Sequence, residues 1–221
     1  MTTSDSTASL SVQGFRHGRV PREVRAAQLL DIAEELFILK GYEGFSIEDL
    51  RRLAGVSRPV VYEHFGTKDA IYVACIRRFH DAYDPAISEA ANHSSTPRDL
   101  IEAGASAFFA ALEANPRAWT LVYSAPGIVG PVADEVERIR SSSVERIEFL
   151  ARLLLPGGVA DERVTAAARF ISGAGEELGR WWMKNTHIAL QGIVTYHCDF
   201  IESILDGELR RTTRPAPGSP T

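Results

Sequence analysis

The chain has 221 residues, of which 45% are hydrophobic and 24% charged, and this composition excludes a collagen-like or wholly disordered protein. Its two cysteines, Cys75 and Cys198, lie far apart without CxxC spacing, which argues against a disulfide framework or a zinc ribbon. The polar N-terminal stretch lacks the apolar core of a signal peptide. The longest uncharged run, Ala118 to Ala133, contains two prolines, whereas a membrane-spanning helix needs about 20 consecutive apolar residues. We therefore expect a soluble, cytoplasmic protein that does not contact a membrane.

The net charge of −5 is unevenly distributed along the chain. Residues 1–80 carry a formal charge of +1, and residues 81–221 carry −6. Arg16, Arg19, Arg22 and Arg25 lie close together near the N-terminus. A basic arm before a helix is a common way to reach phosphates, and a solvated terminus is the equally open alternative.

The pattern of apolar residues and helix boundary signals predicts an all-α fold of about nine helices. Ser46 with Asp49 three residues later is a helix start signal, and Gly41, Gly55 and Gly66 are helix ends. We find neither the sustained two-residue alternation of strands nor an internal repeat. The predicted helices span residues 21–40, 46–55, 57–66, 67–91, 97–114, 116–126, 131–155, 161–184 and 186–209. The flanking stretches 1–15 and 210–221 are predicted to be disordered tails.

The most informative segment is Phe45 to Lys68, FSIEDLRRLAGVSRPVVYEHFGTK. A short helix ends at Gly55, and only Val56 separates it from Ser57, which begins the next helix. Two helices joined by such a short turn at a steep angle form a helix-turn-helix. The apolar residues that would fix this angle are Leu50, Leu53, Val56, Val61 and Phe65.

The other face of the helix after Ser57 is suited to DNA. Arg58 can reach guanine O6 and N7, and Val60 suits a thymine methyl group. Tyr62 and His64 can donate to phosphates. The helix starts at Ser46, Ser57 and Thr67 favour anions, and Lys68 adds a positive charge there. The predicted DNA-binding residues are Ser46, Ser57, Arg58, Pro59, Val60, Tyr62, His64, Lys68 and, on the first helix, Arg22.

This segment resembles the N-terminal DNA-binding domain of the TetR (tetracycline repressor) family of bacterial transcription regulators. The resemblance covers about residues 20–75 and rests on Gly41-Tyr42, Phe45-Ser46-Ile47, Leu53 to Ser57, Val61 to Phe65, and Lys68. Pro59 and Val60 depart from the family pattern, where Gly and Thr are frequent, and this affects the base preference rather than DNA binding. The resemblance implies a DNA-binding domain at residues 16–66 and a helical ligand-binding and dimerisation domain at 67–209.

The resemblance further implies a small-molecule effector and a homodimer. Aromatic residues of the acidic part could line an apolar pocket, although helical spacing makes core packing the better interpretation for each. The predicted pocket residues are Phe108, Trp119, Tyr123, Phe149, Phe170 and Glu177. The last two helices would pair with those of a second subunit, with Gly175, Gly179, Trp182, Ile193, Tyr196 and Phe200 at the interface.

Two glutamates on the helix 161–184 receive different predictions. Glu176 precedes Arg180 by four residues, so we expect a solvated ion pair. Glu177 shares a face with Phe170 and Trp181, so we expect a carboxylate that holds a ligand or, as the alternative, lies at the rim of a subunit interface.

The sequence thus predicts a dimeric regulator, most simply a repressor that a small apolar or amphipathic ligand releases from a palindromic operator. An activator, or a regulator that answers to a protein partner, is the open alternative. An enzyme is disfavoured because HExxH, GxSxG and P-loop motifs are absent. A helix-turn-helix used only for protein contacts is disfavoured by Arg58, Tyr62, His64 and Lys68. No cofactor is expected, and a metal site among His187, His197, Cys198 and Asp199 is disfavoured because His197 and Cys198 face different sides of a helix.

Overall fold

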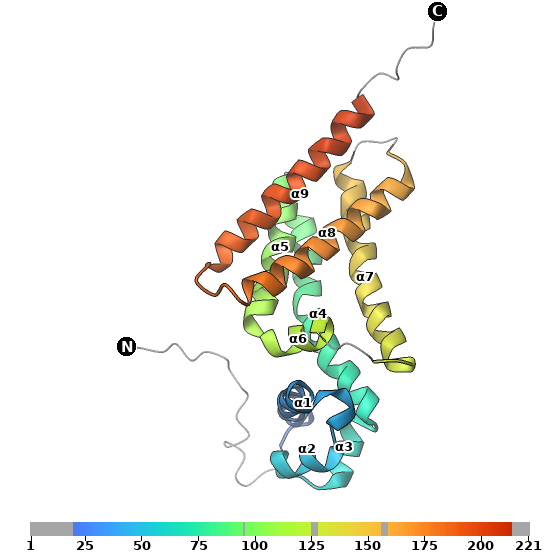
Figure 1. Ribbon diagram of the computed structural model, residues 1–221, viewed down its shortest axis with the longest axis vertical. Helices are drawn as coiled ribbons and strands as arrows, with labels where there is room; N and C mark the ends of the chain where they lie inside the picture. Colours follow the sequence, from blue (N-terminus) through green and yellow to red (C-terminus); the bar gives the residue numbers. More distant parts are fainter. Residues whose placement is uncertain (1–19, 95, 125–127, 156–158, 214–221) are drawn as a thin grey trace, which may run out of the picture. The chain divides into compact units, whose positions relative to one another are not determined.

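The computed structural model describes residues 20–94, 96–124, 128–155 and 159–213, and these residues form helices without a strand (Figure 1). The all-α class predicted from the sequence is therefore confirmed. The helices are α1 (Arg22–Gly44), α2 (Ile47–Ala54), α3 (Arg58–Phe65), α4 (Lys68–His93), α5 (Pro97–Ala114), α6 (Pro116–Ser124), α7 (Pro131–Leu154), α8 (Asp161–Trp182) and α9 (Leu190–Thr213).

The predicted disordered tails fall largely outside the described residues. Residues 1–15 and 214–221 are not among them. Helix α9 continues to Thr213, so residues 210–213 of the predicted C-terminal tail are helical.

The chain divides into two compact units. The first contains the described residues up to Phe79 together with Ala114–Val136, and the second contains His80–Glu113 and the described residues from Glu137 onward. The chain therefore passes between the units three times. The expected boundary between Gly66 and Thr67 falls inside the first unit, and the functional domain boundaries stay a prediction.

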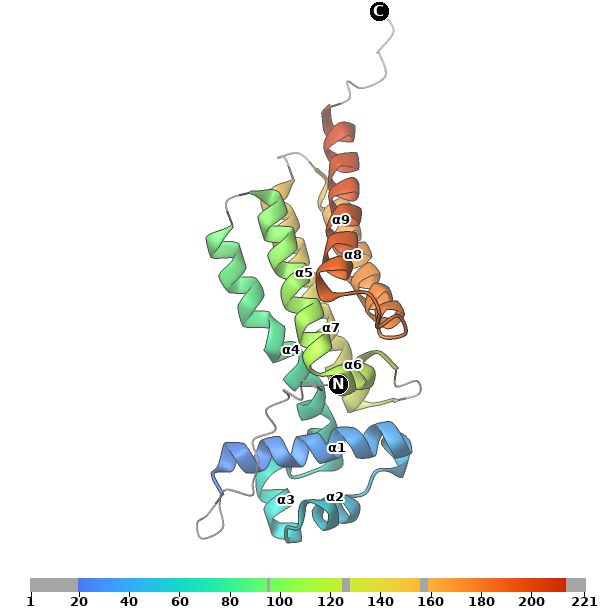
Figure 2. The ribbon, with the colours of Figure 1, turned by 90° about the vertical axis from the view of Figure 1, so that its left-hand side faces the viewer.

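The first unit is built around the apolar stripe of α1. Leu29, Ala33, Leu36 and Phe37 are all buried, as their spacing predicts. The Phe37 ring stacks on Phe45 with centroids 4.0 Å apart. Figure 2 shows α1 stretched across the pair α2 and α3. This packing leaves the far side of α3 available to solvent.

Helix α6 also belongs to the first unit, where it packs against α1. The Tyr72 hydroxyl of α4 donates a hydrogen bond to the Leu121 carbonyl oxygen of α6 at 3.0 Å, and burial raises the pKa of Tyr72 to about 12. The rings of Phe79 and Trp119 meet edge to face at 5.5 Å. Helices α1, α4 and α6 thus share one core.

The second unit has its core between α5, α8 and α9. Phe109 is fully buried and meets the rings of Trp182 and His197 edge to face, at 5.9 and 5.5 Å. The Trp182 indole N–H donates to the Ile188 carbonyl oxygen at 2.8 Å, which fixes the turn between α8 and α9. These two helices lie side by side (Figure 1). None of the described helices has the length and apolarity that crossing a bilayer requires.

Candidate functional site

The helix-turn-helix predicted between Ser46 and Phe65 is present. The Asp49 backbone N–H donates to Ser46 Oγ at 3.1 Å, so Ser46 caps α2 as predicted. Gly55 ends α2 with a left-handed backbone (φ 65°), a conformation that glycine adopts without steric cost. The next helix begins after Ser57, whose side chain makes no capping hydrogen bond. These local signals set the short turn that places α3.

The angle between α2 and α3 is held by fewer residues than the sequence suggested. Leu50 and Val61 are buried at 0% and 1% exposure, whereas Leu53 is 58% exposed. The prediction that Leu53 supports the turn is therefore wrong. In a helix of only eight residues the inward face passes through Leu50 and Ala54, and Leu53 lies beside it.

The free face of α3 carries the residues predicted to bind DNA. Arg58, Pro59 and Tyr62 are exposed, while Val60 and His64 are half-buried. Burial lowers the pKa of His64, with Arg22 as a weaker cause in the same direction. Arg58 Nη2 donates to the Tyr62 hydroxyl at 3.0 Å, and the Arg58 guanidinium carbon lies 5.4 Å from the centroid of that ring. Two predicted DNA contacts thus form a pair within one helical turn.

Arg22 connects the start of α1 to α3. Its Nη2 donates to the Glu63 backbone carbonyl at 3.2 Å, and its Nη1 lies 3.9 Å from the Glu63 carboxylate. Both side chains are more than half exposed, so this pair contributes little to stability. It does place a guanidinium at the C-terminal end of α3.

Lys68, at the start of α4, lies in a small charged cluster. Its Nζ is 4.2 Å from the centroid of the Tyr42 ring and 3.7 Å from Glu43 Oε2. The Tyr42 hydroxyl donates to Asp69 Oδ1 at 2.5 Å, and burial raises the pKa of this phenol with Asp69 as a second cause. Sequence reasoning gave Tyr42 and Asp69 no role at this site. The available signal was an aromatic residue directly after Gly41, where the chain leaves its helical path at φ 71°.

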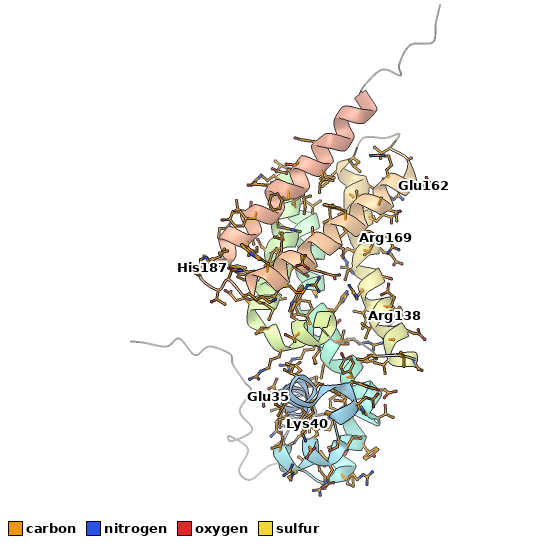
Figure 3. All side chains as sticks on the ribbon, viewed as in Figure 1. Glu35, Lys40, Arg138, Glu162, Arg169 and His187 are labelled. Atoms are coloured by element: carbon orange, nitrogen blue, oxygen red, sulfur yellow. The ribbon has the colours of Figure 1, made fainter. Side chains whose placement is uncertain are left out.

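The acidic residues of α2 neutralise its basic residues. Glu48 pairs with Arg51, and Asp49 accepts hydrogen bonds from Arg52 and from Lys40 of α1, both at 2.6 Å. The hydrogen bond from Lys40 is the largest cause that lowers the pKa of Asp49. Figure 3 shows Lys40 and Glu35 on α1. The basic side chains of α2 are therefore already paired with carboxylates of the same helix.

Comparison with known proteins identifies this arrangement. The sequence profile described as "Bacterial regulatory proteins, tetR family" matches residues 29–75, which include α2 and α3. The transcriptional activator FasR of Mycolicibacterium smegmatis is 27% identical over 175 residues, or 78% of either chain. The transcriptional repressor KstR2 of Rhodococcus jostii is 24% identical over 199 residues, covering 83% of this chain and 90% of its own.

The chain carries the DNA-binding domain of the TetR family at residues 29–75. It is a DNA-binding transcriptional regulator and, like these relatives, not an enzyme. Its fold is shared with the solved structure of FadR from Bacillus subtilis, with a TM-score of 0.67, 16% identity, and coverage of 81% of this chain and 97% of that one. That FadR structure is a complex with stearoyl-CoA.

The residues predicted to line a ligand pocket are distributed over both units. Trp119 is buried against Phe79 in the first unit, and Phe108 is half-buried beside Phe109 in the second. Phe149 and Phe170 are 61% and 62% exposed. The Tyr123 side chain lies outside the described residues. The ligand pocket therefore stays a prediction.

The two glutamates of α8 are placed the opposite way from the prediction. Glu176 is buried and accepts a hydrogen bond from Arg140 Nη2 of α7 at 2.6 Å, and burial raises its pKa despite that guanidinium. Glu177 is exposed and pairs with Arg180 at 2.9 Å. The prediction of a solvated Glu176 is wrong because α7 covers that side of α8. Glu177 is exposed, as are Phe170 and Trp181, and its place at the rim of a subunit interface stays a prediction.

The residues predicted for the dimer interface separate into two groups. Gly175, Gly179, Trp182 and Ile193 are buried within the single chain. A Cβ at Gly175 would lie 3.4 Å from His197 Cε1, so this glycine lets the imidazole ring approach α8 closely. Tyr196 and Phe200 of α9 are 45% and 55% exposed and remain available to a partner.

Proposed function

We propose that this protein is a dimeric repressor of the TetR family that a small apolar or amphipathic ligand releases from a near-palindromic operator. The observation that carries the proposal is the free face of α3, with Arg58 and Tyr62 exposed at its start and middle. The first residues of a recognition helix are those that enter the major groove. Arg22 and Lys68 at the two flanks of α3 would contact phosphates, which position the protein without reading the sequence.

A dimer follows from the length of α3, which has eight residues and can read only a few bases. Two-fold symmetry would place two such helices about one turn of DNA apart, roughly 34–36 Å, on a palindromic site. The exposed aromatic rings of Phe170 and Trp181 on α8 and of Tyr196 and Phe200 on α9 support this, because exposed apolar patches mark protein contacts.

The proposed effector class rests on two observations. The FadR structure that shares this fold is a complex with an acyl-CoA, an amphipathic ligand. The core of the second unit is rich in aromatic side chains, with Phe109 and Trp182 buried and Phe108 half-buried. We also infer a cytoplasmic location, since such a regulator acts where the bacterial chromosome lies.

An activator is the second candidate, because FasR, which aligns with 78% of this chain, is named as one. The free face of α3 serves either function, since both require binding at a specific site. A repressor and an activator differ in where the DNA site lies relative to the promoter and in what the bound dimer contacts.

The experiment begins with selection of bound duplexes from random DNA by the full-length protein. A recovered inverted repeat with half-site centres about one DNA turn apart supports the dimeric arrangement, and a single unrepeated motif contradicts it. Analytical ultracentrifugation at micromolar concentration checks the dimer directly, with Phe200→Glu as the disrupting variant and Val129→Glu, exposed in the first unit, as its control.

Transcription in vitro from a promoter that carries the selected site then decides the sign of regulation. A repressor lowers the amount of transcript, and an activator raises it. Stearoyl-CoA and free stearate serve as the first effector probes. Release of the DNA by either one supports an amphipathic effector, while unchanged binding with both contradicts this part of the proposal.

A further inference from the structure

A buried carboxylate lies where three helices of the first unit meet. Glu34 of α1 is 2% exposed. Its Oε1 lies 3.6 Å from Arg78 Nη1 of α4 but has no hydrogen-bond partner among the described residues. Arg78 instead donates to Asp31 Oδ1 of α1 at 2.6 Å. The guanidinium beside Glu34 is thus already committed to another carboxylate.

Helix α6 completes the surroundings of Glu34. The Asn115 side chain hydrogen-bonds to Glu34, and its Oδ1 also accepts the Ala118 backbone N–H at 3.0 Å, in the first turn of α6. The Arg117 guanidinium pairs with Glu35 at 2.8 Å. The charged and titratable groups around Glu34 are therefore Asp31 and Glu35 of α1, Arg78 and the buried Cys75 thiol of α4, and Arg117 of α6.

These partners lie close to the points where the chain passes between the two units. Arg78 comes directly before Phe79, the last residue of α4 in the first unit, and Asn115 follows Ala114, where the chain re-enters that unit. Glu34 thus interacts with two residues that lie next to such points in the sequence.

The charge of Glu34 determines how stable the junction is at which α1, α4 and α6 pack around it. A buried neutral carboxyl costs much less than a buried carboxylate without sufficient partners, which is strongly unfavourable. Ionised Glu34 would have to share Arg78 with Asp31, while Arg117 is held by Glu35. Admission of water between α1, α4 and α6 would relieve that penalty.

We propose that Glu34 is a proton-dependent latch, which holds α4 and α6 against α1 while it carries its proton and loosens this junction when it ionises. Burial is the main cause that raises the pKa of Glu34 to about 7, so the latch changes state near neutral pH. It would make the connection between the units sensitive to pH whatever the effector is.

Cys75 offers a local readout because its thiol is fully buried beside Glu34. The full-length protein is treated with iodoacetamide at pH 6 and pH 8, and the rate at each cysteine is divided by the rate for the unfolded chain at the same pH. This division removes the ordinary pH dependence of thiol reactivity. The pKa of the Glu34 carboxyl is about 7 in the closed junction and has its ordinary value in the opened one. Normalised labelling of Cys75 should therefore rise about tenfold from pH 6 to pH 8.

The matched variants are Glu34→Gln and Glu23→Gln, which replace a buried and an exposed glutamate of α1. In Glu34→Gln the normalised labelling of Cys75 should be equal at both pH values, while in Glu23→Gln it should keep the tenfold rise. A rise that persists in Glu34→Gln overturns the proposal. If Glu34→Gln does not fold, the wild type still decides through Cys198, the buried thiol of the second unit. A ratio of Cys75 to Cys198 labelling that stays constant between pH 6 and pH 8 overturns the latch.

Discussion

The guanidinium of Arg58 donates a hydrogen bond to the hydroxyl of Tyr62 at 3.0 Å, one turn further along α3. Each side chain therefore limits the rotamers of the other before DNA is present. Such restriction lowers the entropy lost on binding, because less freedom remains to be removed at the interface. Because of this hydrogen bond, a substitution at Tyr62 also changes how Arg58 is held. The roles of Arg58 and Tyr62 in DNA binding must therefore be separated by different measurements.

Arg58→Ala should relax the preference for particular base pairs. If Arg58 contacts guanine through both O6 and N7, its loss costs about 1–3 kcal/mol at that position and little at mismatched sites. Fluorescence anisotropy on the selected operator and on its single-base variants measures this loss. Arg169→Ala, on an exposed position of α8, is the matched control and should bind like the wild type. Unchanged affinity and unchanged base preference in Arg58→Ala would show that α3 does not enter the groove.

Lys68→Gln should weaken binding to every duplex by a similar factor. The Lys68 ammonium lies over the Tyr42 ring at 4.2 Å and is positioned at the start of α4, where a phosphate would be favoured. Loss of one phosphate contact reduces the slope of log K against log salt by about one, without changing the order of preferred sequences. The slope is measured between low and moderate salt on two unrelated duplexes. A change in sequence preference with an unchanged slope would contradict a phosphate contact.

Ser46→Ala should destabilise the helix-turn-helix. Ser46 Oγ accepts the Asp49 backbone N–H at 3.1 Å, and loss of such a cap costs about 1 kcal/mol. Ser57 is the matched control because it stands at the start of α3 without a side-chain capping bond, so Ser57→Ala should cost less. Urea denaturation followed by circular dichroism compares the two variants. Equal destabilisation would mean that the cap bond does not account for the effect at Ser46.

The features that sequence reasoning predicted well are those decided within a few residues. The Ser46 cap, the left-handed Gly55 and the buried stripe of α1 each depend on neighbours along the chain. Exposure on the later helices depends on partners that are distant in sequence. Glu176 is buried because α7 supplies Arg140, and adjacent residues of a helix differ by only about 100° in direction. The periodicity of apolar residues could therefore not decide which of Glu176 and Glu177 is buried.

Trp119, a predicted pocket residue, is a second case in which partners distant in sequence decide where a side chain packs. Its spacing within α6 marks it as apolar and inward, but only the fold shows that it packs on Phe79 in the first unit. The exposed face of α3 was predictable because a short turn and one buried residue, Val61, determine which face is free. The pairing of Lys68 with Tyr42 was not, since it joins the end of α1 to the start of α4.

His197 should make the second unit sensitive to acid. Its ring is buried against Phe109, its Nδ1 has no hydrogen-bond partner among the described residues, and burial lowers its pKa to about 4. In the unfolded chain the imidazole titrates near 6.5, so the unfolded state binds a proton first as the pH falls. The stability associated with neutral His197 is therefore complete above about pH 6.5 and is lost as the pH falls towards 4, by about 3 kcal/mol in all.

The comparison that tests this is His197→Leu, which removes the titrating group and the unpartnered nitrogen while keeping an apolar side chain. Free energies of unfolding from urea titrations at pH 7 and pH 4.5 should differ less in His197→Leu than in the wild type. His187→Leu, on an exposed position between α8 and α9, should retain the wild-type difference. Because the unpartnered Nδ1 is itself unfavourable when buried, we expect His197→Leu to be close to the wild type in stability at pH 7. An equal loss of stability in acid for the wild type and His197→Leu would show that other groups govern the acid response.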